Sequence, residues 1–295
     1  MHSSILIVSK NRNEELDRTL NFLEGAIDKK IHEIRVFLDG CTDNSIALKL
    51  KYPWVSWQVS KISLGASKAR NILYKSAQGT YLFGFDDDAH PLQINFIELA
   101  EDLFFKNPNL GILAFQEIKG KFEKDIVPKD LIRSEDDFLV NDFVGCGFCI
   151  RRKVYDEIRG FPLWIDIYGE EVCVALEVLE KGYDILYTHK ISVNHRVDLE
   201  IRKLQGANYF RFGKQLKNTS FFYLVYYPFP LLLKKITRLY FLNFKKYALQ
   251  DRYYFKEYLK ATKINFMSIS KILEFRKPIS KKTLKKFNSL SNPKY

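Results

Sequence analysis

A short apolar segment that runs directly into three aspartates constrains this chain more than any other feature. Residues 81–85 are aromatic and aliphatic, with Gly79 before them and Pro91 after them, a pattern typical of a buried strand that ends in a loop. Residues 86–88 are all aspartate. Adjacent carboxylates raise one another's pKa unless a cation neutralises them, and Mg²⁺ and Mn²⁺ are cations that accept oxygen ligands. The segment therefore predicts a divalent-cation site, with a solvated acidic turn as the alternative.

Strand and helix patterns alternate on both sides of this segment. Apolar runs predict further strands at 5–8, 34–38, 55–59, 111–115, 144–150, 183–187 and 191–194. Apolar residues at helical spacing, and residues suited to helix starts, predict helices from Asn13, from Leu64, from Pro91 through Phe105, from Arg151 to near Gly160, from Gly169 through Lys181 and from Leu199 to Lys217. This alternation predicts an α/β fold with a doubly wound, mostly parallel central sheet and helices on both faces.

Polar residues that follow the predicted strands are expected to meet at one edge of that sheet. Ser9 and Arg12 follow the first strand, Asp39 ends the second, and the three aspartates follow the fourth. Because ligands of open α/β sheets bind at the carboxyl ends of the strands, the sequence predicts a ligand site at this edge.

Charge divides the chain into two parts. Residues 1–216 carry 29 Lys and Arg against 32 Asp and Glu, a net charge of −3, whereas residues 217–295 carry 18 against 3, a net charge of +15. We predict one domain over 1–216 and a basic, aromatic, helical extension over 217–295. Such an extension suits an anionic membrane surface, and its composition also suits RNA. The membrane is favoured because no nucleic-acid-binding fold is visible and the preceding domain is net acidic.

Several classes of protein and site are disfavoured by the sequence. Four cysteines are too few and too scattered for a disulfide framework, and the amino terminus lacks a secretory pattern, so the expected location is the cytoplasm. Cys146 and Cys149 have zinc-knuckle spacing without a second pair, and we expect structural thiols. Gly145 and Gly147 lack the third glycine of a dinucleotide fingerprint. The apolar run 221–233 contains two prolines and is shorter than the roughly 20 residues of a membrane span.

Six segments in order resemble the motifs of glycosyltransferase family 2, whose members have the GT-A fold. They are the opening strand and Asn-Arg turn at 7–12, the Asp-Asp-Gly-Ser-Thr-Asp turn at 37–45 with Leu38 in place of its first aspartate, the glycine-to-Ala-Arg-Asn segment at 65–71, the Asp-x-Asp motif at 86–88, the segment before the catalytic acid at 150–161, and the Glu-Asp pair with the catalytic base at 169–171. The resemblance extends over about residues 4–196.

This resemblance implies transfer of one sugar, with inversion, from a UDP-, dTDP- or GDP-sugar to a hydroxyl of a glycan or lipid-linked acceptor, in cell-surface polysaccharide or glycolipid synthesis. It implies a nucleotide-binding part at about 1–118 and an acceptor part at about 119–216. A divalent cation, Mn²⁺ or Mg²⁺, is expected on Asp88 and His195. Glu171 is the expected general base, with Glu170 as the alternative. Nucleotide contacts are expected for Ser9, Asn11, Arg12, Asp39, Lys68, Arg70, Asp86 and Asp87.

Departures from the family pattern leave alternatives open. Cys173 and Glu177 replace an Asp and an Arg that are common in the helix after the base, and with Leu38 they leave room for an inactive nucleotide-sugar-binding homologue. A nucleotidyltransferase is the other alternative, although the first strand lacks its glycine-rich activating loop. The Gln-x-x-Arg-Trp signature of processive synthases is absent, so the resemblance is to non-processive, bacterial-type members. No nucleic-acid partner is expected, and the tail is the candidate contact with the inner face of the plasma membrane.

Overall fold

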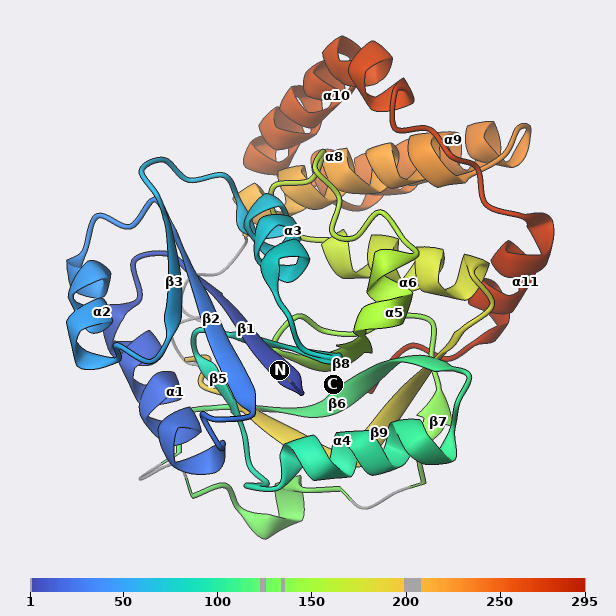
Figure 1. Cartoon of the computed structure of the whole chain (residues 1–295). Helices are drawn as coiled ribbons and strands as arrows, with labels where there is room; N and C mark the ends of the chain where they lie inside the picture. Colours follow the sequence, from blue (N-terminus) through green and yellow to red (C-terminus); the bar gives the residue numbers. More distant parts are fainter. Residues whose placement is uncertain (1, 123–125, 134–135, 199–207, 295) are drawn as a thin grey trace.

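The central element is a nine-stranded sheet with the order β3-β2-β1-β4-β8-β6-β9-β5, in which β7 pairs with β9 (Figure 1). The computed structural model describes residues 2–122, 126–133, 136–198 and 208–294. The strands are β1 Ser3–Ser9, β2 His32–Asp39, β3 Ser56–Ser60, β4 Tyr81–Asp86, β5 Ala89–Pro91, β6 Leu110–Lys119, β7 Phe138–Leu139, β8 Gly147–Arg151 and β9 Asp184–His195. Each predicted strand is present, and the mostly parallel α/β sheet is confirmed.

The pairing of the strands explains how residues distant in sequence meet at one edge. Strands β3, β2, β1 and β4 run parallel, so their carboxyl ends lie together. Strand β8 is antiparallel to both β4 and β6, while β9 is parallel to β6. The short strand β5 then pairs antiparallel with the end of β9, with Ala89 opposite His195. This last pairing brings the residue after β4's acidic loop to the end of β9.

Helices cover both faces of the sheet, as predicted. One apolar core packs Leu16, Leu20 and Leu23 of α1 and Phe96 and Ala100 of α4 against the sheet, and the opposite core packs α3, α5 and α6. The helical segments before β9 are α1 Asn13–Ala26, the 3₁₀ turn Asn44–Ala47, α2 Leu48–Lys51, α3 Ala66–Ser76, α4 Phe96–Lys106, the 3₁₀ turn Lys129–Leu131, α5 Arg152–Asp156 and α6 Glu170–Glu180.

Three local predictions differ from the structure. Pro91 does not start a helix: it ends β5, because residues 89–91 pair with β9, and α4 begins only at Phe96. The strands predicted at 183–187 and 191–194 form the single strand β9, which keeps pairing with β6 across an irregularity in register. Helix α5 ends at Asp156 rather than near Gly160. In the first two cases pairing with a distant strand decides what local pattern leaves ambiguous.

The carboxyl-terminal part of the chain is helical and packs on the domain before it. It contains α8 Tyr209–Tyr226, α9 Leu231–Asn243, a π-helical turn Phe244–Ala248, α10 Arg252–Leu273 and α11 Lys281–Ser289. Helices α8, α9 and α10 lie at the far side of α3 and α6 from the sheet, whereas α11 lies beside α6 (Figure 1). The predicted boundary between 216 and 217 falls inside α8. The first part of the helix predicted at 199–217 lies outside the described residues. Across the described ranges, no helix combines the length and the apolar character that crossing a bilayer requires.

An apolar core joins this extension to α6. Cys173 and Leu176 of α6 pack with Phe221 and Val225 of α8, and Ile272 of α10 completes the cluster. The extension is therefore part of the folded core, and a chain cut within α8 would expose that core.

Candidate active site

An open cavity of about 620 Å³ lies at the carboxyl edge of the parallel strands. Its walls come from the β1–α1 loop, the loop after β4, the ends of β6 and β9, and the start of α6. The lining residues that carry charge are Arg12, Arg70, Asp86, Asp87, Asp88, Glu117, Lys119, Asp142, Glu170, Glu171, His195 and Arg211. Asp88 and Glu171, the expected cation ligand and the expected base, thus share one cavity, as the resemblance to a sugar transferase requires.

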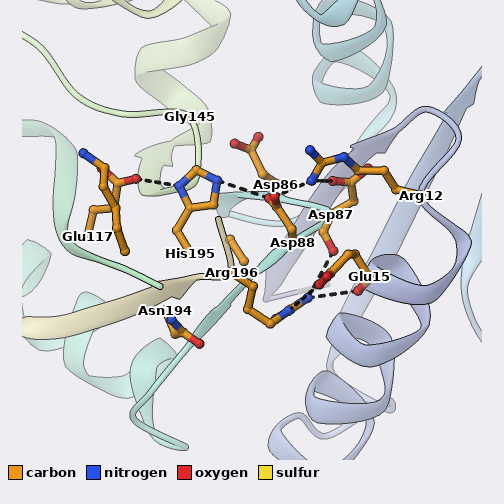
Figure 2. Close-up of polar contacts among 12 residues, drawn as sticks. Arg12, Glu15, Asp86, Asp87, Asp88, Glu117, Gly145, Asn194, His195 and Arg196 are labelled. Atoms are coloured by element: carbon orange, nitrogen blue, oxygen red, sulfur yellow. Dashed lines mark hydrogen bonds and ion pairs between the residues drawn. The ribbon is translucent and has the colours of Figure 1, made fainter. Parts of the chain in front are cut away.

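Asp88 is held between the side chains of Arg12 and His195. Arg12 binds one carboxylate oxygen of Asp88, and Nε2 of His195 lies 3.2 Å from the other (Figure 2). Burial alone would raise the pKa of Asp88, but the hydrogen bonds from His195 and Arg12 outweigh it and lower that pKa. Asp88 is therefore an anion in this site.

Asp86, Asp88 and His195 form a candidate metal site. Their nearest ligand atoms lie within 4.8 Å of one another. Two carboxylate oxygens and an imidazole nitrogen are a donor set that Mn²⁺ accepts readily. The three residues come from β4, its following loop and the end of β9, which the pairing of β5 with β9 brings together.

Glu117 is a residue of this site that sequence analysis missed. Its Oε1 lies 2.5 Å from Nδ1 of His195, on the side of the ring away from Asp88 (Figure 2). Burial lowers the pKa of His195, but hydrogen bonds with Asp88, Cys146 and Glu117 outweigh burial and raise it. A carboxylate behind a ligating imidazole fixes the orientation of the ring. Sequence analysis missed it because the strand predicted to end at Phe115 runs on to Lys119, which places Glu117 near the carboxyl end of β6.

Asp87 is turned toward the protein. Ser9 Oγ donates to its Oδ2 at 2.7 Å, and Arg12 lies 3.6 Å from its Oδ1. Burial, together with Asp88, raises the pKa of Asp87 to about 7. The predicted residues Ser9 and Arg12 therefore contact the acidic loop directly, and Ser9 reaches the cavity only through Asp87.

Arg70 of α3 joins the acidic loop to the start of α6. Its guanidinium lies 2.7 Å from Asp86, 2.9 Å from Glu171 and 3.2 Å from Glu170. Burial would lower the pKa of Arg70, but these carboxylates outweigh burial and raise it. Gly145 lies beneath this cluster, and a Cβ there would collide with both the guanidinium and the Glu171 carboxylate. Only glycine leaves room for the contact.

The two glutamates at the start of α6 have different surroundings. The Glu170 side chain is 4 % exposed and that of Glu171 is 19 % exposed. Burial and the adjacent charge of Glu171 raise the pKa of Glu170, and its Oε2 has no hydrogen-bond partner among the described residues. Glu171 is thus the carboxylate that a substrate can reach more easily.

The turn before α6 is strained and is held by the extension. Tyr168 has a φ of 72°, a left-handed conformation that is rare for a bulky residue. Asn218 of α8 donates to the carbonyl oxygens of Ile167 and Tyr168 at 2.8 and 2.9 Å. The extension therefore positions the start of α6, on which Glu171 lies.

Asp142 is a further carboxylate that sequence analysis missed. It lines the cavity, and burial, together with Glu171, raises its pKa to about 8. It lies between the strands predicted at 111–115 and 144–150, where the sequence predicts neither a strand nor a helix, so local pattern carried no signal for it. The carboxyl-terminal segment holds this stretch in place, because Asn141 donates from its backbone to Ser291 and from its side chain to Phe287.

Besides Ser9, three predicted nucleotide contacts lie outside the cavity lining. Asn11 bonds with Thr42 in the neighbouring turn. Asp39 accepts hydrogen bonds from Ser63 Oγ and from the backbone of Leu64 and Gly65, at 2.6 to 3.0 Å. Lys68 is exposed on α3. Their contacts with a nucleotide stay predictions.

Solved structures resemble this chain at low sequence identity. TarS of S. aureus is 14% identical, with a TM-score of 0.60 and coverage of 94% of this chain and 83% of that one. The mannosyltransferase PcManGT of Pyrobaculum calidifontis, solved with GDP-Man and Mn²⁺, is 13% identical over 93% of this chain and 72% of that one, with a TM-score of 0.56. GalNAc-T7, solved with UDP, GalNAc and Mn²⁺, is 18% identical over 68% of this chain, at a TM-score of 0.56. The chain spans 44% of the GalNAc-T7 chain. These similarities confirm the GT-A fold.

A sequence profile of one family covers more than half of the chain. The profile described as "Glycosyl transferase family 2" matches residues 4–159. The chain therefore belongs to glycosyl transferase family 2, and its identification as a glycosyltransferase is confirmed. No curated protein matches the sequence. The matched residues include the three aspartates and end before Glu170.

Proposed function

We propose that this enzyme transfers a single sugar from a nucleotide diphosphate sugar to an acceptor hydroxyl, with inversion at the anomeric carbon. The observation that carries the proposal is that the cluster of Asp86, Asp88 and His195 and the carboxylate of Glu171 line one cavity, joined through Arg70. A leaving diphosphate needs positive charge, and an attacking hydroxyl needs a base. This cavity offers residues for both.

A divalent cation, Mn²⁺ or Mg²⁺, is proposed on Asp88 and His195, with Asp86 beside them. When bound, such an ion neutralises the charge that develops on the leaving diphosphate. The chain's own part is to hold the ligands: Glu117 orients the imidazole and Arg12 orients Asp88. Donors with UDP, GDP or dTDP fit this chemistry. In support, TarS was also solved with UDP-GlcNAc, and PcManGT with GDP-Man.

Glu171 is the proposed general base, because it is the more exposed of the two glutamates at the start of α6. A positioned base contributes about 10²- to 10⁴-fold in rate. Glu170, the alternative, is nearly buried against Arg70 and suits the role of holding that guanidinium. The helix dipole also stabilises an acidic side chain at a helix amino terminus, whether or not that side chain acts in catalysis. The proposal therefore needs a kinetic test.

The test is a panel of UDP-, GDP- and dTDP-sugars, with and without Mn²⁺, read out as hydrolysis and transfer. Wild type should release nucleotide from one donor class. E171Q should bind that donor with unchanged affinity and lose about 10²-fold or more in transfer rate, whereas D88A should lose Mn²⁺-dependent donor binding in calorimetry. Normal turnover by E171Q would refute the base, and metal-independent donor binding by wild type would refute the cation site. A protein that binds a donor and never turns it over would be the inactive homologue.

We also propose that the extension contacts an anionic membrane near a lipid-linked or polysaccharide acceptor. Helix α10 exposes apolar side chains at helical spacing, namely Phe255, Leu259, Phe266 and Leu273, and it carries Lys256, Lys260 and Lys263 among them. This combination favours an interfacial helix over anionic lipid. A peripheral location on the inner face of the plasma membrane and a role in cell-surface polysaccharide or glycolipid synthesis would follow.

Liposome flotation tests this contact. Removing the extension by truncation at residue 217 would divide α8. Surface substitutions are therefore the better test. The double variant F266S/M267S should lose flotation with vesicles of phosphatidylcholine and phosphatidylglycerol, whereas L50S, which changes an exposed leucine of α2, should float like wild type. Equal flotation of all three proteins would argue against α10 as the contact.

A further inference from the structure

A second cavity, of about 640 Å³, opens beside the cavity that contains Asp88 and Glu171, which is called the catalytic cavity below. The second cavity is built mainly by the extension. Its lining comes from the turn before α6, the start of α6, α8, α9, the π-helical turn, α10 and α11. Figure 1 shows α8, α9 and α10 lying together. It shares Tyr168, Gly169, Val172, Arg211 and Gln215 with the catalytic cavity. Val172 is the residue next to the proposed base. The second cavity is called the aromatic cavity below. A molecule bound in it would therefore lie beside Glu171.

The lining of the aromatic cavity suits a carbohydrate. Aromatic rings supply apolar faces, and they include Tyr168, Phe212, Tyr223, Tyr227, Tyr247 and Tyr254. Side-chain amides supply polar groups between them, from Gln215, Asn218 and Asn243. The CH-rich faces of sugar rings pack on aromatic faces, while their hydroxyls bond with amides. A pocket with a few convergent polar groups among aromatic rings is therefore suited to bind a sugar.

The oxygen of one of these amides lacks a hydrogen-bond partner. Asn218 is 2 % exposed, and its Oδ1 accepts no hydrogen bond among the described residues. Its Nδ2 is already used by the turn at 167–168. A buried acceptor without a donor costs free energy, and a donor that reached this oxygen would recover that cost.

The charge of the aromatic cavity is opposite to that of the catalytic cavity. Its lining contains no Asp or Glu, and it contains the cations Arg211 and Lys235. Neither cation has an ion-pair partner within the described part of the chain. Arg211 lies over the Tyr168 ring at 5.0 Å, and Lys235 lies 5.6 Å from the centre of the Tyr227 ring. An acidic group on a bound molecule would be attracted by Arg211 and Lys235 and repelled by Asp142 and Glu171.

From this separation of charge we infer that the aromatic cavity binds the acceptor, and that the acceptor is an acidic glycan, one that carries carboxylate or phosphate groups. Its acidic group lies against Lys235 and Arg211, which points the neutral, hydroxyl-bearing end toward Glu171. This inference rests on the proposed function and names its acceptor class.

The test is binding to an array of neutral, uronate-bearing and phosphate-bearing oligosaccharides. Wild type should bind the acidic oligosaccharides, and it should bind them more weakly in 0.5 M salt. Salt screens ion pairs, because the Debye length falls from about 10 Å at 0.1 M to about 3 Å at 1 M ionic strength. K235A should bind them about tenfold more weakly, the effect of one charge-assisted contact. K234A, which changes the neighbouring exposed lysine outside the cavity, is the matched control and should bind like wild type. The uronate and phosphate arms distinguish the two sources of charge.

A second pair of variants and a donor measurement complete the test. Y247A should lose binding of acidic glycans, whereas Y253A, which removes an exposed tyrosine outside the cavity, should keep it. Preference for neutral glycans, no binding of acidic ones by wild type, or equal loss in K235A and K234A would overturn the inference. Donor binding with Mn²⁺ is measured separately on the same proteins: its absence in wild type refutes the proposed function, whereas donor binding without acidic-glycan binding refutes only the acceptor class.

Discussion

Replacing Arg70 with methionine should destabilise the protein strongly, because its buried guanidinium forms ion pairs with three carboxylates. The Arg70 side chain is 9 % exposed, and it lies 2.7 to 3.2 Å from Asp86, Glu171 and Glu170. Removing one partner of a buried ion pair costs about 3–5 kcal/mol. With an unfolding entropy of about 2.1 cal/mol/K per residue, this loss lowers the melting temperature by roughly 5–8 °C for a chain of this length.

The assay is thermal and urea unfolding of wild type, R70M and the control K68M. Lys68 lies on the same helix but is exposed, so K68M should unfold like wild type. Burial and Glu171 already raise the folded-state pKa of Glu170, and without Arg70 that pKa rises further. A raised folded-state pKa contributes stability at low pH that is lost as pH rises through that value, so the R70M deficit should be larger at pH 9 than at pH 5.

Adding E170Q to R70M should restore part of the lost stability, because Glu170 is the most buried of the three carboxylates and glutamine carries no charge. The reasoning would be refuted if R70M melted within about 1 °C of wild type, well below the expected shift. It would also be refuted if the deficit were independent of pH and untouched by E170Q.

Three further variants probe the site. The pKa of Asp142 is raised to about 8, so its contribution to stability is present near pH 4 and lost as pH rises through 8; D142N should flatten this decline in urea unfolding, and a parallel decline would contradict it. E117Q should weaken Mn²⁺ binding about tenfold in calorimetry, because Glu117 orients His195; unchanged affinity would remove that role. G145A should cost about 1–3 kcal/mol in unfolding free energy, since its Cβ collides with Arg70, and wild-type stability would contradict the packing.

Local pattern was enough for the strands other than β5 and β7, and for the edge at which the parallel strands meet. The continuous apolar runs in β1, β2 and β4 can only be buried on both sides, so a parallel sheet covered by helices follows from them. The three aspartates after β4 then lie at the carboxyl edge by topology alone. The family motifs in order carried the enzyme class, which the profile match confirmed.

Pattern was insufficient where a distant segment decides the outcome. Residues 89–91 contain proline after an acidic turn, and only pairing with β9 makes them a strand. Glu117 and Asp142 are ordinary acids in sequence, and they become part of the site because β6 continues past the predicted end and because the carboxyl-terminal segment holds the 138–142 stretch. The basic composition of the tail likewise did not show that its helices share a core with α6.

The sequence by itself determined which side chains follow the strands, and hence which elements contribute to the edge of the sheet, because the burial of apolar runs depends on period and composition. Only the tertiary structure decided that Arg70 ties Asp86 to Glu171, and that Asn218 of the extension holds the turn before that glutamate. Contacts of this kind join residues some 16 to 101 positions apart. Their geometry depends on how whole helices pack, which no local pattern encodes.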